Sequence, residues 1–322
     1  MQGRSAFSTS ASGPVAYRAG RIAGAQLRWF TRNGESQEEF ARPDAEGATG
    51  PALSPGGQRV AIVRSSGGNA DVWIVDRAGG AVSRLTVNPA QEVFPVWTPD
   101  ESAVAFRSSR GNTFDIYMTR IEASGSDTLL LSADALGVPQ ISPSDISRNG
   151  RWLLFYSTPQ GASRDAWAYP IGQSGGQAHR LVGTSADESN PRFSPDGRWI
   201  SYQTNESGRI EIAVRGFPSS ERMWQVSAGG GVHARWSRDG SELFYVAPDG
   251  QLMAVQVSAS GSEFRTSRPV ALFAPRFAEN PAANPFNAQY DVAADGRFLV
   301  NVAVDDLASA PITLILNWKG IN

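Results

Sequence analysis

The sequence contains no cysteine and only two histidines among its 322 residues. Thiolate chemistry and cysteine-based zinc sites are therefore excluded. No window holds the roughly 18 apolar residues of a transmembrane helix, and the N-terminal stretch lacks the apolar core of a signal peptide. We expect no membrane insertion of this chain and, as the sequence is written, a cytoplasmic protein. A fragment of a membrane-anchored parent would instead be extracytoplasmic.

Clusters of basic residues are also missing. The 29 Lys and Arg residues and the 31 Asp and Glu residues are scattered, and the formal net charge is −2. A protein that binds nucleic acid or an anionic membrane surface usually carries a basic patch. We therefore expect no nucleic-acid partner.

The sequence does contain a repeat. In residues 191–226 a Ser-Pro-Asp-Gly turn is flanked by short runs that alternate apolar and polar residues, which is typical of antiparallel strands. Similar turns recur at intervals of 43 to 56 residues, close to the period of about 40–50 residues in β-propeller blades. The seven turns begin at Ser10, Ser54, Thr98, Ser147, Ser194, Ser237 and Ala293. An acid begins the third strand of four repeats, at Asp71, Asp115, Asp165 and Glu211, where we expect it to accept hydrogen bonds from a neighbouring turn.

This repeat predicts an all-β fold, a seven-bladed β-propeller of four-stranded antiparallel blades that forms one domain over residues 1–322. The irregular fourth and last units leave six or eight blades as alternatives. The predicted blades span about residues 6–46, 51–88, 94–133, 140–184, 190–228, 233–274 and 288–318. The seventh lacks a fourth strand, so we expect it to be three-stranded and to expose the edge Ile312 to Leu316 for self-association. The proline-rich loop Ala274 to Ala288 should lie over one face of the disc.

The turn, the aromatic strand that follows it and strands such as Asp115-Ile116-Tyr117 resemble the blade repeat of TolB-type, WD-like β-propellers. The last third, including Trp224-Gln225-Val226-Ser227 and the ending Pro311 to Trp318, resembles the C-terminal propeller of bacterial membrane-anchored serine/threonine protein kinases. The resemblance implies a sensor-like or scaffold module that binds a ligand or a protein. The kinase motifs H-R-D and D-F-G are absent, so kinase activity does not transfer.

Polar residues precede several predicted innermost strands, which in a propeller places them around one mouth of the central channel. They lie four or six residues before a turn and are Glu92, Glu188, Asn190, His233, Asn287 and Gln289. We expect these residues to bind a peptide, a protein or a small molecule. A second set lies two residues before the turns, where Arg192 and Arg235 alternate with Asp145 and Asp291. This layer predicts ion pairs between blades or a charged channel lining.

An alternative function is a weak, promiscuous metal-dependent hydrolase of esters, lactones or phosphotriesters, similar in kind to lactonase-like propellers. The divalent cation, calcium or zinc, would be held by Glu92, Glu188, Asn190 and Asn287. His233 or Glu188 would then be the catalytic base. The string Gly172 to Gly176 matches G-x-S-x-G, but it lies in a predicted hairpin instead of between a strand and a helix. Since mouth residues of most propellers are polar merely because they face water, a non-catalytic binding module remains the principal prediction.

Overall fold

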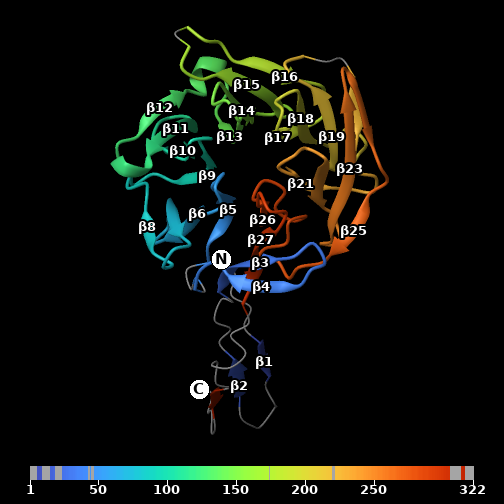
Figure 1. Cartoon of the computed structure of the whole chain (residues 1–322). Helices are drawn as coiled ribbons and strands as arrows, with labels where there is room; N and C mark the ends of the chain where they lie inside the picture. The colour runs from blue at the N-terminus through green and yellow to red at the C-terminus, as the bar shows by residue number, and fades with distance from the viewer. Residues whose placement is uncertain are drawn as a thin grey trace.

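Six antiparallel sheets stand around a central axis in the computed structural model of this chain (Figure 1). The structure describes residues 6–8, 15–18, 24–42, 44, 47–173, 175–219, 222–304 and 313–315. The predicted all-β propeller is confirmed. The predicted count of seven blades is wrong, and the alternative of six is the observed number.

Five of the blades are built from consecutive strands. Blade A contains β5 (Thr49–Leu53), β6 (Arg59–Ser66), β7 (Asn69–Asp76) and β8 (Val82–Arg84). Blade B contains β9 (Glu92–Trp97), β10 (Ala103–Ser108), β11 (Asp115–Arg120) and β12 (Thr128–Leu131). Blade C contains β13 (Ile141–Ile146), β14 (Trp152–Ser157), β15 (Asp165–Pro170) and β16 (His179–Val182). Blade D contains β17 (Glu188–Phe193), β18 (Trp199–Thr204), β19 (Glu211–Gly216) and β20 (Met223–Gln225). Blade E contains β21 (Val232–Trp236), β22 (Glu242–Val246), β23 (Leu252–Ser260), β24 (Glu263–Thr266) and β25 (Val270–Phe273).

The sixth blade, called the closing blade, combines the two ends of the chain. Its order is β26 (Tyr290–Val292), β27 (Phe298–Ala303), β3 (Ala25–Phe30) and β4 (Ser36–Glu39). Six residue pairs join β27 to β3, from Phe298 with Phe30 to Ala303 with Ala25. Strands that we predicted in the first and seventh blades therefore share one sheet, which is why there is one blade fewer than there are turns. This pairing seals the ring and leaves β27 without a free edge.

A separate three-stranded sheet lies outside the ring, next to the closing blade in Figure 1. It contains β1 (Ala6–Ser8), β2 (Val15–Arg18) and β28 (Thr313–Ile315). β28 pairs with β2, from Val15 with Ile315 to Tyr17 with Thr313, so this segment is not a strand of the closing blade as predicted. Ile312 and Leu316 lie outside the described residues, and self-association through this segment stays a prediction.

The repeated turn is stabilised by its first residue. In the turn after β17, the Ser194 hydroxyl accepts a hydrogen bond from the Trp199 N–H at 3.0 Å and donates one to Asp196 at 2.6 Å. The first turn residue accepts the same bond in blades A, B, C and E, through Ser54, Thr98, Ser147 and Ser237. The hydroxyl and carboxylate replace backbone partners that the chain reversal would otherwise leave unpaired. This explains why the sequence repeats this turn chemistry.

The acids that begin the third strands also serve the fold. Asp115 accepts the Ala133 N–H at 2.8 Å, and Glu211 accepts the N–H groups of Gly229 and Gly230. The predicted bonds to a neighbouring turn are confirmed for these two acids. Asp71 and Asp165 instead contact arginines of the adjacent outer strand, Arg84 at 2.8 Å and Arg180 at 3.5 Å.

The hydrophobic core consists of apolar layers between neighbouring blades. Trp29 of β3 is 1% exposed and packs with Val60 and Ile62 of blade A. On the other side of the closing blade, the rings of Phe298 and Phe244 meet edge to face with centroids 5.0 Å apart. Each such side chain contributes about 1.5–3 kcal/mol through burial. Every blade thus depends on both neighbours.

Helical structure in the described residues is limited to two short 3-10 segments, η1 (Ile121–Ala123) and η2 (Asp134–Leu136). Among these residues no helix has the length and apolar character needed to span a bilayer.

Candidate functional site

The central channel has two different mouths. The inner strands β5, β9, β13, β17, β21 and β26 line the axis, and each begins near one mouth and ends in a turn near the other (Figure 1). We call the first the loop mouth and the second the turn mouth. The predicted ligand-binding residues lie at the loop mouth, whereas the charged layer lies at the turn mouth.

Residues 274–288, called the capping loop, lie over the loop mouth. Asn190 and Gln203 of blade D both donate to the Pro285 carbonyl, at 2.7 and 3.0 Å. Phe286 stacks on Tyr156 of blade C, with ring centroids 6.0 Å apart. The prediction that this loop lies over one face of the disc is confirmed. Its contacts cover the mouth where we expected a ligand.

Four inner strands contain the same bulge near the loop mouth. Gly50, Phe94, Asn190 and His233 each lie four residues before a turn and have φ values of 59, 60, 49 and 58°. The strand register shifts next to each of them. A positive φ costs a non-glycine residue energy and persists only where the surroundings enforce it. At His233 they do, because its N–H donates to Gln203 at 2.8 Å and the Tyr290 hydroxyl donates to its carbonyl at 2.8 Å.

The His233 side chain is a poor base in this position. The residue is 1% exposed. Burial, together with the positive charge of Arg235, lowers the pKa of His233 to about 3. The imidazole is therefore neutral at pH 7, and a base with so low a pKa accepts protons weakly from a substrate.

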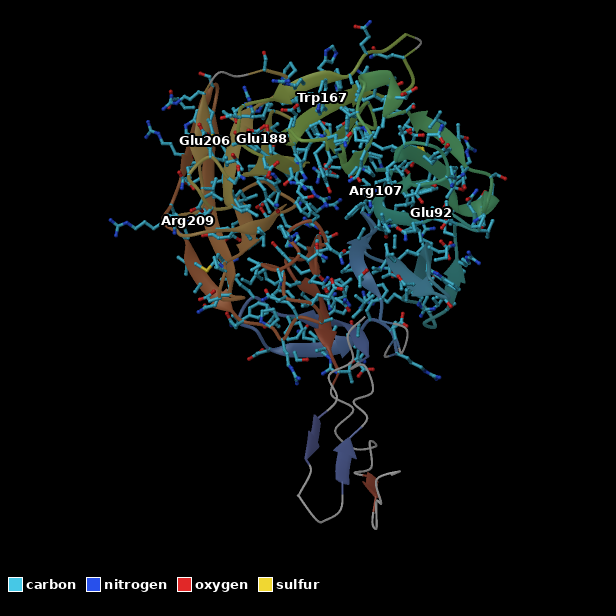
Figure 2. The ribbon with its side chains drawn as sticks, turned by 180° about the vertical axis from the view of Figure 1, so that it is seen from behind. Glu92, Arg107, Trp167, Glu188, Glu206 and Arg209 are labelled. Atoms are coloured by element: carbon cyan, nitrogen blue, oxygen red, sulfur yellow. The ribbon has the colours of Figure 1, made fainter. Side chains whose placement is uncertain are left out.

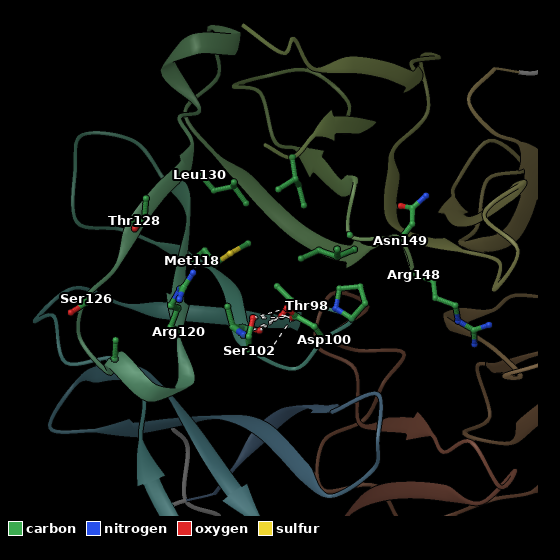
Figure 3. Close-up of a pocket in the computed structure, with 16 residues that line it drawn as sticks. Thr98, Asp100, Ser102, Met118, Arg120, Ser126, Thr128, Leu130, Arg148 and Asn149 are labelled. Carbon is green, nitrogen blue, oxygen red and sulfur yellow. Dashed lines mark hydrogen bonds between the residues drawn. The ribbon is translucent and has the colours of Figure 1, made fainter. Parts of the chain in front are cut away.

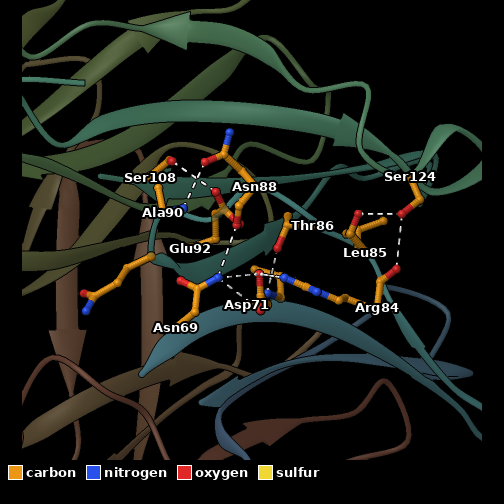
Figure 4. A network of polar contacts seen from close by, with 12 residues as sticks. Asn69, Asp71, Arg84, Leu85, Thr86, Asn88, Ala90, Glu92, Ser108 and Ser124 are labelled. Carbon is orange, nitrogen blue, oxygen red and sulfur yellow. Dashed lines mark hydrogen bonds and ion pairs between the residues drawn. The ribbon is translucent and has the colours of Figure 1, made fainter. Parts of the chain in front are cut away.

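Glu92 belongs to a polar network that joins blades A and B (Figure 4). Its carboxylate accepts hydrogen bonds from the Ser108 hydroxyl at 3.2 Å and from the Arg110 guanidinium at 3.0 Å. Burial raises the pKa of Glu92, while the Thr86 hydroxyl and Arg110 act against this rise. The residue is wholly buried, and protein donors occupy Oε1, whereas Oε2 has no hydrogen-bond partner among the described residues.

Glu188 is buried at the start of β17 in blade D. Its carboxylate accepts a hydrogen bond from the Thr184 hydroxyl at 2.5 Å, and burial raises its pKa. Figure 2 shows Glu92 and Glu188 well apart, on different blades. Each acid therefore has its own set of protein partners.

Asn287 and Gln289 meet through the capping loop itself. Both side-chain amides donate to Glu279, at 2.9 and 3.1 Å. Asn190 and His233 are joined through Gln203, whose side-chain carbonyl oxygen accepts the Asn190 side-chain amide and the His233 backbone N–H. In the described part of the chain, no three His, Cys, Asp or Glu side chains are grouped so that they could hold a metal ion.

The turn mouth opens into a cavity of about 410 Å³. All six inner strands or the turns after them contribute to its wall. The charged residues of the wall are Asp145, Arg148, Arg192, Arg235, Arg238 and Asp291.

The predicted charged layer forms the floor of this cavity. Arg235 of blade E donates to Asp291 of the closing blade at 3.1 Å, and Arg192 of blade D lies 4.0 Å from Asp145 of blade C. The prediction of ion pairs between blades in a lined channel is confirmed. The aspartates are also bound by backbone N–H groups, Asp145 by Phe193 and Asp291 by Leu53.

Arg192 is the least satisfied member of this layer. Its Nε is buried and finds no hydrogen-bond partner among the described residues. Burial and the neighbouring charge of Arg235 lower the pKa of Arg192 to about 10, and it still carries its charge at pH 7. The side chain as a whole is 25% exposed, and a partly buried cation without a full set of partners favours an added anion.

Two exposed arginines cross the turn mouth above this floor. Arg148, in the turn of blade C, donates to the Arg238 carbonyl of blade E at 3.2 Å. Arg238 donates to the Pro55 carbonyl of blade A at 3.4 Å. Both bonds are long and solvent-exposed, so a stronger acceptor can displace them.

A second cavity of about 720 Å³ lies between blades B and C, next to the turn mouth (Figure 3). Met118 and Leu130 of blade B face Ile146 and Ile171 of blade C across it. Pro99, Ile146 and Arg148 line both cavities, so the two cavities are neighbours. The signal for this site in the sequence was the alternation of charge two residues before the turns, whereas nothing indicated the apolar cavity beside it.

Residues 35–164 match the family model of the TolB beta propeller domain. The predicted TolB-type resemblance is thereby confirmed. The resemblance to kinase propellers remains a prediction.

Two curated relatives are similar to this chain. An uncharacterized peptidase of Bacillus subtilis is 26% identical over 161 residues, which are 49% of this chain and 22% of that protein. An uncharacterized protein of Agrobacterium fabrum is 25% identical over 207 residues, which are 60% of this chain and 68% of that protein. The chain therefore spans only about a fifth of the length of the peptidase.

Solved structures show the same fold. A TolB structure from Agrobacterium tumefaciens has a TM-score of 0.64 at 15% identity and covers 88% of this chain and 99% of that one. TolB from Acinetobacter baumannii has a TM-score of 0.59 at 16% identity, with 79% and 65% covered. An oligogalacturonate lyase solved with manganese has a TM-score of 0.57 at 12% identity, with 95% and 98% covered. At these identities the likeness concerns the fold alone.

Proposed function

We propose that this TolB-like propeller is a non-catalytic binding module whose ligand enters at the turn mouth. One observation carries the proposal: a polar cavity formed by all six blades, with under-satisfied Arg192 in its floor, lies next to a cavity between two blades that is lined in part by apolar side chains. A concave site with a few convergent polar groups beside apolar surface is the usual form of a ligand site. The rigid ring holds these groups in place without needing a conformational change.

The position of the two neighbouring cavities favours a peptide segment over a compact small molecule. One is lined by all six blades around the channel axis, and the other lies between blades B and C. A segment of a protein partner can place successive side chains in the two cavities, in the manner of other grooves that recognise extended peptides.

The hydrolase alternative gains no support from the contacts. Glu92 is bound by Arg110 and Glu188 by Thr184, on separate blades. His233 has its pKa near 3 and lies under the capping loop. No particular observation favours a catalytic metal over a binding site.

The proposal is tested by blocking the turn mouth. Since the chain has no cysteine, a single Ala294→Cys variant can be labelled with a bulky maleimide at an exposed wall residue of the cavity. Peptides selected from a displayed random library against the unmodified protein should lose binding by more than tenfold after labelling. The matched control is labelled Val270→Cys, at a 59% exposed position on the outer strand β25. Selected peptides that bind both labelled proteins with unchanged affinity would contradict the proposal.

A further inference from the structure

We infer that the turn mouth is a carboxylate-binding subsite, and that its ligand is a peptide segment carrying a carboxylate next to an apolar side chain. The inference rests on the proposed function and specifies its ligand chemistry.

The charge of the cavity wall supports an anionic ligand. Four arginines and two aspartates line it, a net formal charge of +2, whereas the whole chain carries −2. Positive charge is therefore concentrated at this mouth on a slightly acidic protein. A cleft lined by one sign of charge attracts ligands of the opposite sign.

The aspartates do not neutralise this site for a ligand, because the protein already uses them. Asp291 accepts Arg235 at 3.1 Å and the N–H groups of Leu53 and Val292 at 3.0 and 2.9 Å. Asp145 accepts two N–H groups, whereas its distance to Arg192 is 4.0 Å. The guanidinium of Arg192 therefore keeps N–H groups that no described residue accepts, Nε among them.

Arginine is the side chain best suited to hold a carboxylate at such a place. Its planar guanidinium donates two parallel hydrogen bonds to the two carboxylate oxygens. At the rim, Arg148 and Arg238 donate to carbonyl groups alone within the described part of the chain, at 3.2 and 3.4 Å. A carboxylate is a stronger acceptor than a carbonyl, so both rim arginines gain by exchanging their partner for the ligand.

The adjoining cavity determines what stands beside the carboxylate. Met118, Leu130, Ile146 and Ile171 offer apolar side chains, and the cavity reaches the mouth at Arg148 (Figure 3). Burying one aliphatic side chain there contributes about 1.5–3 kcal/mol. The carboxylate of the ligand fixes its orientation, and the apolar side chain beside it adds to its affinity for the protein. The carboxylate can come from a chain terminus or from an Asp or Glu side chain.

Binding of three fluorescent leucine-rich hexapeptides, measured by fluorescence anisotropy, distinguishes these two sources of the carboxylate. One has an internal Glu and an amidated C-terminus, one has Gln and a free C-terminal carboxylate, and one has Gln and an amidated C-terminus. We expect at least one of the two charged peptides to bind ten times more tightly than the neutral one at low salt. The preference should shrink at high salt, since ionic contacts are screened.

Variants assign the preference to residues. Arg192→Gln should abolish the tenfold difference. Arg148→Gln should reduce it at least threefold, and because Arg148 is exposed, this variant keeps the test valid if Arg192→Gln does not fold. The matched control, Arg209→Gln, changes an arginine whose side chain is 63% exposed and projects outward from the disc (Figure 2), and should leave all affinities unchanged.

The outcomes separate this inference from the proposed function. Equal binding of the three peptides, sensitive to the label on Ala294→Cys, would overturn the carboxylate subsite and leave the binding module standing. A charge preference that persists in both Arg192→Gln and Arg148→Gln would also overturn it. If none of the three peptides binds at millimolar concentration, the carboxylate inference fails, and the labelling experiment alone decides the proposed function.

Discussion

Individual residues in this propeller offset unfavourable backbone with contacts to a neighbouring blade. Glu101 stands where most of the repeated turns have glycine and has a φ of 58°. Such a conformation costs about 1–2 kcal/mol outside glycine. Its carboxylate accepts the Gly56 N–H of blade A and pairs with Arg59 at 3.2 Å. The acid is retained at a glycine position because it links two blades.

The buried imidazole of His233 makes the stability of the fold depend on pH. Its folded pKa of about 3 lies below the unfolded value of 6.5, because it is buried beside Arg235 and Arg192 while backbone groups of Asn284 and Pro281 partly counteract them. The unfolded chain therefore binds the extra proton between these values, and stability is lost as pH falls from about 6.5 toward 3. The slope is at most about 1.4 kcal/mol per pH unit for one group.

The measurement is denaturant unfolding of the wild type and of His233→Asn between pH 7.5 and 5. Asparagine suits the positive φ at this position and does not titrate. The variant should lose stability less steeply on acidification. Glu92 and Glu188, whose raised pKa values act in the opposite direction, are common to both proteins and cancel in the comparison. Identical slopes would contradict the depressed pKa.

At the scale of elements, the capping loop depends on a few side chains for its position. Phe286 stacks on Tyr156, and the Arg164 guanidinium lies 4.5 Å from its ring centroid. We expect Phe286→Ala to reduce the free energy of unfolding by about 1–2 kcal/mol, since the ring is only half-buried. Proteolysis within residues 274–288 should become faster because the loop opens more easily.

Limited proteolysis with mass spectrometry locates the cleavage. The matched control is Leu129→Ala, at a 49% exposed position on blade B, which should change neither quantity. Unchanged protection of the loop in Phe286→Ala would show that its position does not depend on this stacking.

The elements themselves were largely predictable from the sequence. Alternation and the repeated turns placed strands within residues 6–46 and 288–318, and β3 and β27 lie in these ranges. Their partners were not predictable, because alternation sets which face of a strand is buried but not which edge it meets. The bulges at Asn190 and His233 limited how well the sequence could predict the candidate site. A bulge adds a residue to the strand and redirects the side chains around it. The number of residues between a polar side chain and the turn therefore did not indicate whether that side chain faces an open mouth.

At the scale of the whole molecule, integrity depends on the closing blade. Deleting residues 1–42 removes β3 and β4, which exposes the edge of β27 and uncovers the layer formed with Trp29. We expect this variant to self-associate and to lose the cooperative thermal transition. Deleting only residues 1–23 leaves β3 in place and should change the free energy of unfolding by less than about 1 kcal/mol, because the ring pairs without β1 and β2.

Light scattering and calorimetry on the two deletion variants check this. A monomeric variant lacking residues 1–42 with an unchanged transition would contradict closure through β3. Association of the variant lacking residues 1–23 would indicate that the small sheet protects another surface.

The closing blade also sets an order of events during synthesis. β3 and β4 leave the ribosome before every other strand of the ring, but their partner β27 begins at Phe298. Blades A to E are each built from consecutive strands and can assemble as they emerge. β3 and β4 must wait, with one face of Trp29 uncovered, until blades A to E and β27 have been translated. A ribosome that stalls before β27 is translated would thus hold an open ring in which the apolar strand β3 is unpaired. A chaperone that binds nascent apolar strands can recognise this strand.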